Sequence, residues 1–452
     1  MNLLRRALKF YRETGNSASL ARAVFGSAGL RLVGAGLAFL VGVQLARGLG
    51  VEGNGLYGIA LAIFSLAVIP VDLGLTQVVT REAARARTSD ELAGARSLVT
   101  YAMRVVFAGA LLIAALWWLS GLLVPRWLSP AMYTTLGWAV VLLPFAVWGS
   151  LVSAALRGLH RVVEGQVVEL LIRPALVAIL LFTATHVLVA GSLTPAHAMA
   201  INAVAAIAGL GYAWYRLRLL LTKVASRPAT SAQRREWRGS GLPLAFGEGM
   251  RVLSASLGLL LLGAMASMHE AGLYRVAVSL YAAAALPAAL INIACAPMLV
   301  KLNAEGNHQA IRRLNAAIVV GLIVICAVAM VPFVVWGEPL IGGLFGTEFR
   351  QANAILLILL ASELVASFLG HPLLVLSMLH QERAASRYTF QAMLMNGLVC
   401  LVLLPRLGGM GAALAFGVSQ VYLRLMCWHR ARSILGIETS VLALRPYSRT
   451  LP

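Results

Sequence analysis

The sequence predicts an all-α integral membrane protein. We expect about 12 transmembrane helices in two six-helix lobes, related by a parallel internal repeat around a central cavity. Hydrophobic residues make up 60% of the 452 residues, charged residues make up only 12%, and the mean hydropathy is +0.84. This composition excludes an ordinary soluble domain. Apolar stretches also recur along the whole chain, and a motif of the first half returns in the second.

Each apolar stretch is long enough to cross a bilayer, which takes roughly 20 helical residues. Polar, glycine-rich or proline-containing segments separate the stretches and set the expected helix ends. The predicted spans are approximately 22–47, 55–80, 97–124, 133–156, 163–187, 195–221, 241–266, 272–299, 312–336, 350–378, 386–404 and 408–430.

The repeat consists of a short motif in the second span of each half. Gly55-Leu56-Tyr57, then Ala60 and Pro70, recur at one constant offset as Gly272-Leu273-Tyr274, then Ala277 and Pro287. Such duplications are typical of transporters, in which a site forms between two lobes. Chance is the alternative explanation, because glycine, leucine and alanine are common in membrane helices.

The longest polar break, near 223–241, divides the chain between the predicted sixth and seventh spans. We predict an N-terminal lobe at 1–222, a cytoplasmic linker at 223–238, a C-terminal lobe at 239–435 and a cytoplasmic tail at 436–452. Because each lobe holds an even number of spans, both lobes begin on the same side of the membrane and the repeat is parallel.

The formal charge of +20 is best explained by membrane topology. Most lysines and arginines fall in segments that are cytoplasmic if the N-terminus is inside, which places both termini in the cytoplasm. The excess also favours contact with anionic membrane lipids and does not indicate nucleic-acid binding. The predicted outer loops hold only Arg47, Arg126, Arg275, Arg350 and Arg406.

Several other features narrow the class of protein. The first apolar run follows a long basic arm, so no cleavable signal peptide is expected. The outer loops are short, and no phosphate-binding loop is present, which argues against nucleotide hydrolysis. No cofactor or metal is expected, because the cysteines lack metal-ligand spacing and are interpreted as small apolar residues: Cys295, Cys326, Cys400 and Cys427.

Charges inside the bilayer are costly and mark candidate functional residues. Arg31, Arg173 and Arg251 each lie about 14 Å into a span that runs outward from the cytoplasm. Their guanidinium groups suit the bidentate binding of phosphate. They are the predicted substrate-binding residues, for a diphosphate or glycan in the cavity.

A structural role is the alternative for each arginine. Glu169 lies one turn before Arg173, and Glu248 lies nearly one turn before Arg251, so either pair could simply neutralise itself. Arg31 has no acidic neighbour at helical spacing. We interpret two further arginines, Arg104 and Arg424, as snorkelling to the cytoplasmic surface.

The remaining candidates are acidic residues and prolines. Asp72, Glu248 and Glu363 are candidates for ion coupling or gating, with hydrogen bonding inside a lobe as the alternative. Pro70 and Pro287 are candidate hinges, because each removes an intrahelical hydrogen bond. The alternative is that membrane helices tolerate proline without bending functionally.

Several motifs in the first 180 residues together resemble a known family. The motifs are Gly53-x-Gly55-x-Tyr57-Gly58, Asp72-x-Gly74-Leu75, Arg81-Glu82-Ala83-Ala84, Arg157-Gly158-Leu159-His160-Arg161, Gly165-Gln166, Glu169 and Arg173-Pro174. With these motifs the sequence is similar to Wzx-type oligosaccharide-lipid flippases of the multidrug/oligosaccharidyl-lipid/polysaccharide exporter superfamily. The second half contributes only its repeat and its number of spans.

The resemblance implies two six-helix lobes around a cavity that opens alternately to each side. It implies no enzymatic activity and, as substrate, a polyprenyl-diphosphate-linked oligosaccharide for O-antigen of lipopolysaccharide, capsule or exopolysaccharide. The expected location is the bacterial cytoplasmic (inner) membrane, with the polysaccharide polymerase and chain-length machinery as candidate partners. Cationic cavity residues are a theme of this family, and the matching positions are Arg31, Arg173 and Arg251.

Three other functions are alternatives, and a feature of the sequence argues against each of them. A cation-coupled multidrug exporter of the same superfamily should have an acidic cavity rather than one with arginines. A peptidoglycan-precursor flippase is expected to have about 14 spans, which exceeds the number predicted from these apolar stretches. A membrane polymerase or ligase should carry a large outer loop, and none is predicted.

Overall fold

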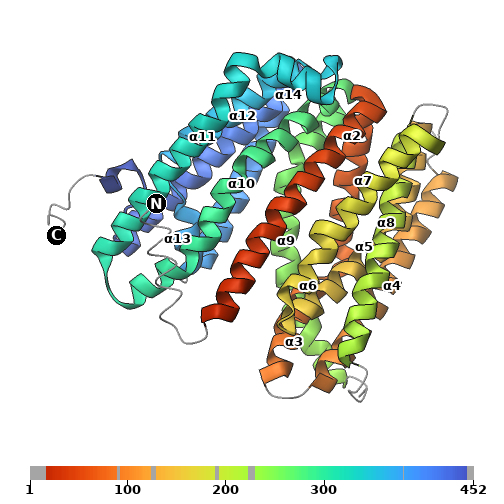
Figure 1. Ribbon diagram of the computed structural model, residues 1–452, viewed down its shortest axis with the longest axis horizontal. Coiled ribbons are helices and arrows are strands. Elements are labelled where there is room, and N and C mark those ends of the chain that lie inside the picture. The colour runs from red at the N-terminus through yellow and green to blue at the C-terminus, as the bar shows by residue number, and fades with distance from the viewer. Residues whose placement is uncertain are drawn as a thin grey trace. The chain divides into compact units, whose positions relative to one another are not determined.

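The computed structural model describes residues 17–88, 92–123, 129–188, 193–221, 230–379 and 381–444. The described residues are helical apart from short connections, which confirms the all-α prediction (Figure 1). Parts of the predicted N-terminal arm, linker and tail lie outside the described residues, at 1–16, 222–229 and 445–452.

The first half of the chain forms helices joined by short connections. Two of its spans contain a wide turn or a sharp break, considered below. The elements are α2 (Ser17–Asp72), α3 (Leu75–Thr88), α4 (Leu92–Leu123), α5 (Pro130–Gly158), α6 (Val162–Val167), η1 (Val168–Ile172), α7 (Arg173–Thr183), η2 (Ala184–Leu188) and α8 (Pro195–Leu221).

The second half continues in the same way and ends in a short helical turn. Its elements are α9 (Ser231–Met265), α10 (Met268–Ala304), α11 (His308–Phe345), η3 (Thr347–Phe349), α12 (Ala352–Ser367), α13 (Pro372–Met378), α14 (Glu382–Leu435) and η4 (Val441–Leu444). The last eight residues of the predicted linker, 231–238, therefore belong to α9.

The number of spans agrees with the sequence prediction. Among the described residues, nine helices are long and apolar enough to cross a membrane, and the pair α12 and α13, bent by 57°, makes ten if it is counted as one broken span. Two of these helices contain a sharp break at a glycine with positive φ, at Gly50 in α2 and at Gly408 in α14. Gly50 lies between two predicted spans, and Gly408 is the first residue of the last predicted span, so dividing the two helices there yields twelve segments.

The contacts divide the chain into two compact units. Unit 1 contains 1–44 and 63–249, and unit 2 contains 45–62 and 250–452. This division differs from the predicted lobes, because it assigns the segment Leu45–Ala62 to the unit built mainly from the second half. The early part of α9 is likewise counted with unit 1. The predicted lobes remain a prediction from the repeat.

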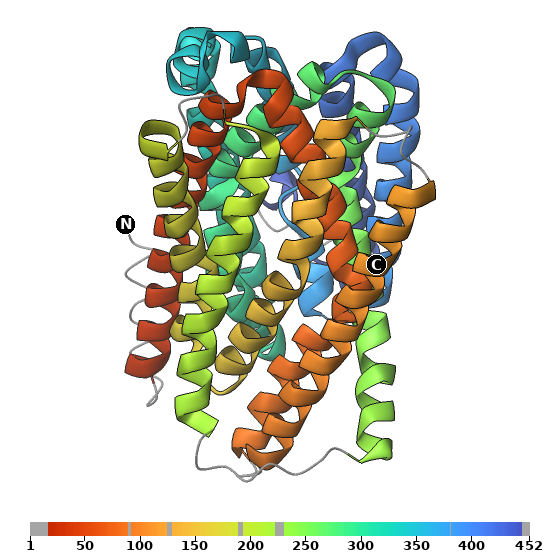
Figure 2. The same ribbon diagram turned by 90° about the vertical axis from the view of Figure 1, so that its right-hand side faces the viewer.

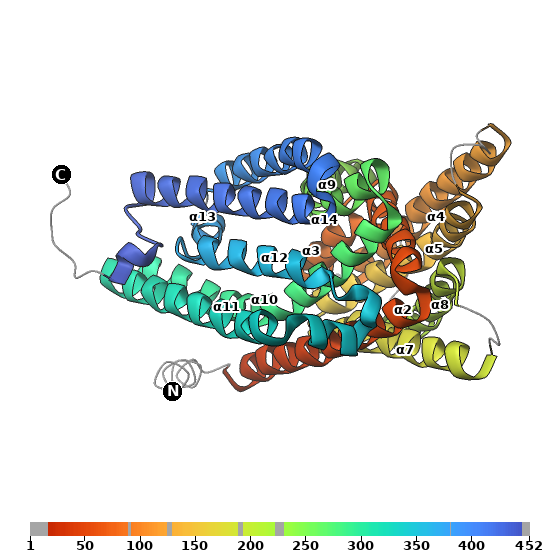
Figure 3. The same cartoon turned by 90° about the horizontal axis from the view of Figure 1, so that it is seen from above.

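Within each unit the long helices pack lengthwise. In unit 1, α5 packs against α3, α4 and α8, and the yellow-green α8 lies alongside α5 (Figure 2). In unit 2, α10, α11 and α12 pack against one another, and α14 packs on α12 (Figure 3). Large apolar side chains remain exposed on the outer helix faces, as expected for helices that contact lipid.

The repeated motif forms a close helix crossing inside unit 2. A Cβ atom on Gly55 would lie 2.0 Å from the carbonyl oxygen of Met268, and a Cβ on Gly272 would lie 2.0 Å from the carbonyl oxygen of Val51. Val51 and Met268 are themselves equivalent in the repeat, so the two copies meet symmetrically. Membrane helices associate through such small residues, which let the two backbones approach.

The other repeated residues surround this crossing. Tyr57 is 2% exposed and Tyr274 is 5% exposed, and Ala60 and Ala277 are fully buried. The residues that the two halves of this chain share at these positions are therefore buried side chains in the packed helices. This packing argues against chance as the origin of the repeat.

Arg275 breaks the symmetry of the crossing. Its repeat equivalent is Gly58, and a Cβ on Gly58 would lie 2.5 Å from Cδ of Arg275, so the glycine leaves the space that the longer side chain fills. The Arg275 Nη1 donates to the backbone oxygen of Asn54 at 3.0 Å and to its side-chain oxygen, and the guanidinium lies 4.5 Å from the ring centre of Tyr57. The prediction of Arg275 as an outer-loop residue is wrong, because it lies within α10.

The start of the predicted tail is docked on unit 2. Glu438 accepts hydrogen bonds from Nε1 of Trp428 at 2.6 Å and from the backbone of Ser440 at 3.0 Å, and Asn315 donates to its carbonyl oxygen at 3.1 Å. Burial raises the pKa of Glu438, but the hydrogen bonds from Ser440 and Trp428 outweigh burial and hold the pKa below its usual value. The ionised carboxylate thus holds η4 against the ends of the helices.

We predict that Gly272→Ala destabilises the protein, whereas Gly36→Ala does not. The new Cβ at position 272 would collide with the backbone of Val51, at a cost of about 1–3 kcal/mol, whereas nothing lies within 4 Å of a Cβ at Gly36. Thermal unfolding of the purified protein measures the difference. An equal midpoint for Gly272→Ala and the unsubstituted protein would contradict the close crossing.

Candidate functional site

The three predicted phosphate-binding arginines lie on three helices. Arg31 is exposed on α2, Arg173 is half-buried at the start of α7, and Arg251 is exposed on α9. Arg31 and Arg173 belong to unit 1, and Arg251 belongs to unit 2. Arg173 and Arg251 each interact with another residue. No hydrogen bond or ion pair to another described residue is found for Arg31.

Arg31 and Arg173 flank a close contact between α2 and η1. A Cβ on Gly34 would lie 2.7 Å from the carbonyl oxygen of Leu170, and a Cβ on Gly26 would lie 3.6 Å from Val163. Gly26 precedes Gly34 as Val163 precedes Leu170, so the two helical segments run parallel here. Arg31 lies one turn before this contact and Arg173 one turn after it, about 9 Å apart along the helix axes.

The wide turn before Arg173 follows from the proline after it. Pro174 has no backbone N–H, so the regular hydrogen bond to the carbonyl of Leu170 cannot form. The backbone N–H of Arg173 instead bonds to the carbonyl oxygen of Val168, five residues earlier, which is the π-helical pattern. Such turns occur at functional sites because they re-aim the side chains around them.

Glu169 has a partner that the sequence spacing did not predict. Its Oε2 accepts from Nη1 of Arg157 on α5 at 3.2 Å. One alternative from the sequence was that Glu169 and Arg173 neutralise only each other. The ion pair with Arg157 shows that Glu169 has a second arginine beside it. Two guanidinium groups and one carboxylate occupy this part of unit 1, leaving a net positive charge.

Asp72 caps a helix next to a second tight crossing. Its Oδ1 accepts from the backbone N of Thr76 at 3.2 Å and from Oγ1 of Thr76 at 2.6 Å, and so satisfies the start of α3. The chain between the two helices turns through Gly74 at positive φ, where a Cβ would lie 2.2 Å from the carbonyl oxygen of Gly241. Glu248 lies two turns further along α9, and a Cβ on its neighbour Gly249 would lie 3.4 Å from Ile69, one turn before Asp72 on α2. Two of the predicted ion-coupling carboxylates therefore lie on the two helices of this crossing.

Glu363 lies in a buried charged cluster in unit 2. Its carboxylate forms an ion pair with Arg424 of α14 and accepts a hydrogen bond of 2.8 Å from the hydroxyl of Tyr281 of α10. Glu363 and Arg424 are each 8% exposed, so the interpretation of Arg424 as snorkelling is wrong. Because two donors occupy the carboxylate, this geometry favours the structural alternative for Glu363.

The two candidate hinge prolines lie in different local structures. Helix α2 ends at Asp72, two residues after Pro70, and the chain then turns through Leu73 and Gly74 at positive φ. Helix α10 instead runs on past Pro287 to Ala304. Both prolines are exposed, and their hinge role stays a prediction.

Among the described residues, no group of three or more histidine, cysteine, aspartate or glutamate side chains could hold a metal ion. The cysteines are free, and Cys326, Cys400 and Cys427 are buried as small apolar residues.

Comparison with known proteins identifies a family and a fold. A family model described as polysaccharide biosynthesis protein matches residues 20–303. The inward-facing conformation of a multidrug resistance MATE family transporter of the MOP superfamily is similar with a TM-score of 0.73 at 14% identity, over 90% of this chain and 98% of that chain. No curated protein matches this chain in sequence.

Two further solved structures share the fold. The lipid II flippase MurJ, in an inward closed conformation, gives a TM-score of 0.64 at 12% identity, over 91% of this chain and 87% of that chain. A MOP superfamily transporter from Pyrococcus furiosus, described as having a binding pocket of reverse polarity, gives 0.63 at 13% identity, over 94% of this chain and 97% of that chain.

We predict that removing one member of the buried ion pair is worse than removing both. Arg424→Leu should cost about 3–5 kcal/mol, because it leaves Glu363 charged and buried, and adding Glu363→Leu should recover much of this loss. Thermal unfolding of the two single variants and the double variant measures the coupling.

The exposed pair Lys301 and Glu305, 3.7 Å apart, is the control for this cycle. Its coupling should be below about 1 kcal/mol. Additive effects of the two substitutions at 363 and 424 would contradict the buried pair.

Proposed function

Because this chain belongs to the polysaccharide biosynthesis protein family, we propose that it is a flippase for polyprenyl-diphosphate-linked oligosaccharides. It would move them from the cytoplasmic to the outer face of the bacterial cytoplasmic membrane, for O-antigen, capsule or exopolysaccharide. The chain is a multi-pass membrane protein with the fold of transporters and flippases. MurJ, which is described as a lipid II flippase, shares this fold. This likeness supports a lipid-linked sugar as the substrate proposed here.

The observation that carries the proposal is the position of Arg31 beside Arg173. Two guanidinium groups along adjacent parallel helices, inside apolar segments, present several N–H donors to a doubly charged group. Placing a charge such as that of Arg31 in an apolar segment is unfavourable unless it has a function or a partner. A diphosphate would supply both for Arg31, and Arg173, which also interacts with another residue, would add further donors. We include Arg251 as the third phosphate-binding residue.

Alternating access would act through the Gly55 and Gly272 crossing. This contact holds a segment of the first half against the second half within unit 2. We propose that the two repeat copies behave as lobes, with Pro70 and Pro287 as hinges.

A cation-coupled exporter is the second candidate, and the proximity of Asp72 and Glu248 favours it. Two like charges in one apolar region are relieved when one of them takes up a proton or both share a cation. The same pair is compatible with a flippase that is driven by an ion gradient. We propose that Asp72 and Glu248 bind the coupling ion and that Glu363 holds the structure of unit 2.

We predict that Arg31→Gln and Arg251→Gln lower flipping of a polyprenyl-diphosphate-linked oligosaccharide by at least about tenfold, since each removes a charge-assisted contact with phosphate. The measurement is the rate at which the labelled glycan becomes accessible to an outside enzyme in proteoliposomes. Arg313→Gln, an exposed arginine at the start of α11, is the control and should leave the rate unchanged. Unchanged rates in both test variants would contradict the proposal.

We predict a different result for the carboxylates. Asp72→Asn and Glu248→Gln should abolish the dependence of the rate on an imposed proton or sodium gradient, because neither amide can exchange a proton or balance a cation. Flipping without a gradient should persist. Gradient-driven export of cationic drugs by the unsubstituted protein, with no flipping of glycan, would instead establish the exporter.

A further inference from the structure

A cleft in unit 1 lies apart from the residues proposed to bind the substrate. Its volume is about 510 Å³. It opens between α4 and α8, which both pack on α5 but make few contacts with each other. Among the described residues, the lining comes from these two helices: Arg96, Val99 and Thr100 of α4, and Trp214, Leu217, Arg218 and Leu221 of α8.

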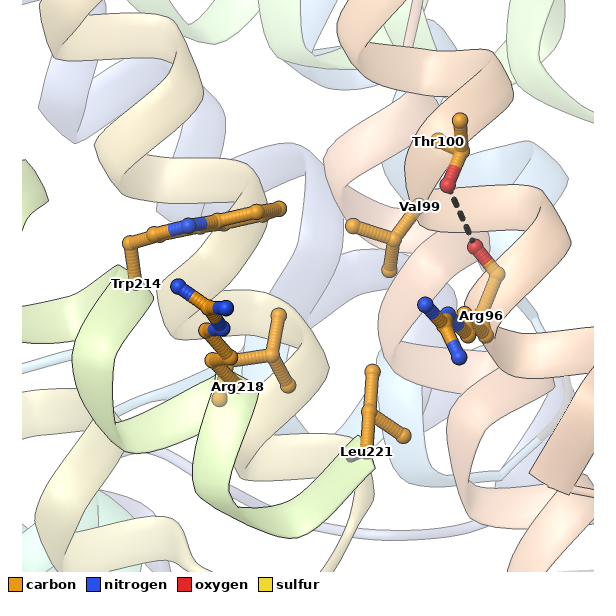
Figure 4. Close-up of a pocket in the computed structure, with 7 residues that line it drawn as sticks. Arg96, Val99, Thr100, Trp214, Arg218 and Leu221 are labelled. Carbon is orange, nitrogen blue, oxygen red and sulfur yellow. Dashed lines mark hydrogen bonds between the residues drawn. The ribbon is translucent and has the colours of Figure 1, made fainter. Parts of the chain in front are cut away.

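Figure 4 shows how the lining side chains face one another. Arg96 and Arg218 stand on opposite sides of the cleft, and Trp214 lies one helical turn from Arg218 on the same face. Thr100 donates its hydroxyl proton to the carbonyl oxygen of Arg96, at 2.9 Å. The described lining thus combines two arginines, each of which also interacts with another residue, with apolar groups.

The position of the cleft along the helices places it at the level of lipid head groups. Arg96 lies in the second turn of α4, and Arg218 lies in the last turn of α8. Both ends are predicted to be cytoplasmic by the distribution of charge. Tryptophan is enriched at this level of the membrane, because its ring is apolar and its N–H is polar. Trp214 is 44% exposed, as such a residue would be.

An apolar surface continues from the cleft toward the middle of the membrane. Phe107, two turns beyond Thr100 on the same face of α4, is exposed and stacks on Trp148 of α5 at 5.8 Å. Ile207, two turns before Trp214 on α8, is also exposed. A ligand that fills the charged end of this cleft can therefore lay a hydrocarbon chain along the two helices.

From this arrangement we infer that the cleft between α4 and α8 binds the phosphate-bearing head group of a membrane lipid. Arg96 and Arg218 clasp the phosphate oxygens from two sides, and Trp214 covers the glycerol or first prenyl unit. Basic pockets between transmembrane helices on the cytoplasmic side bind anionic head groups for this reason. The site is distinct from Arg31, Arg173 and Arg251, and it does not depend on which substrate is flipped.

Native mass spectrometry of the purified full chain tests the site. The unsubstituted protein, released from nanodiscs of mixed composition, should retain phosphatidylglycerol in preference to phosphatidylcholine. Arg96→Gln with Arg218→Gln should lower this retention by at least about tenfold, since two charge-assisted contacts are lost. Arg104→Gln is the control, because it removes an exposed charge from the same helix two turns away, outside the cleft.

The same experiment separates the two sources of lipid phosphate. Displacement of phosphatidylglycerol by a short-chain polyprenyl diphosphate would identify the cleft as a lipid-diphosphate site, and retention would identify a phospholipid site. Both results support the inference. Equal retention of phosphatidylglycerol in the double variant and in Arg104→Gln would overturn it.

A second measurement does not require the double variant to fold. Phosphatidylglycerol with brominated acyl chains should quench the fluorescence of the protein, and Trp214→Phe should remove part of that quenching. Arg96→Lys should keep most of the phospholipid, because lysine retains the charge but not the bidentate geometry. Identical quenching with and without Trp214 would also overturn the site.

Discussion

A close approach of two backbones, at Gly55 and Gly272, holds the segment Leu45–Ala62 in unit 2. In a membrane the surrounding lipid is as apolar as the helices, so association depends on van der Waals contact and on polar bonds rather than on the exclusion of water. Both are present at this crossing. The glycines allow contact between the backbones, and Arg275 adds hydrogen bonds to Asn54 and a stacking contact with Tyr57.

The apolar environment also explains why most charged side chains within the helices have a partner. A buried charge needs a partner, and most of the intramembrane charges have one in the described structure. Glu363 is held by Arg424 and Tyr281, and Glu169 is bound by Arg157. Arg31 and Arg104 are exposed and have no such partner among the described residues, and the proposed diphosphate site is centred on Arg31 because its helix packs against the one that carries Arg173.

The elements of the fold could be predicted well because each depends on residues that are close in sequence. The apolar runs set the spans, and the breaks fall at Gly50, between two predicted spans, and at Gly408, where the last predicted span begins, because glycine accepts a positive φ. The prediction for Arg424 was wrong because the distance from a helix end does not reveal which face of the helix carries the side chain. The packing of α14 on α12 buries this arginine against Glu363.

The amino-acid sequence by itself determined the membrane class, the duplication and the candidate residues for binding phosphate or protons, since hydropathy, spacing and side-chain chemistry are local properties. Only the tertiary structure decided which charges are neutralised. Glu363 lies far from Arg424 along the chain, and Arg96 lies far from Arg218, and helix packing brings each pair to one place. Packing also explains why position 58 is a glycine. In this close crossing the side chain of Arg275 occupies the space that a side chain at position 58 would need.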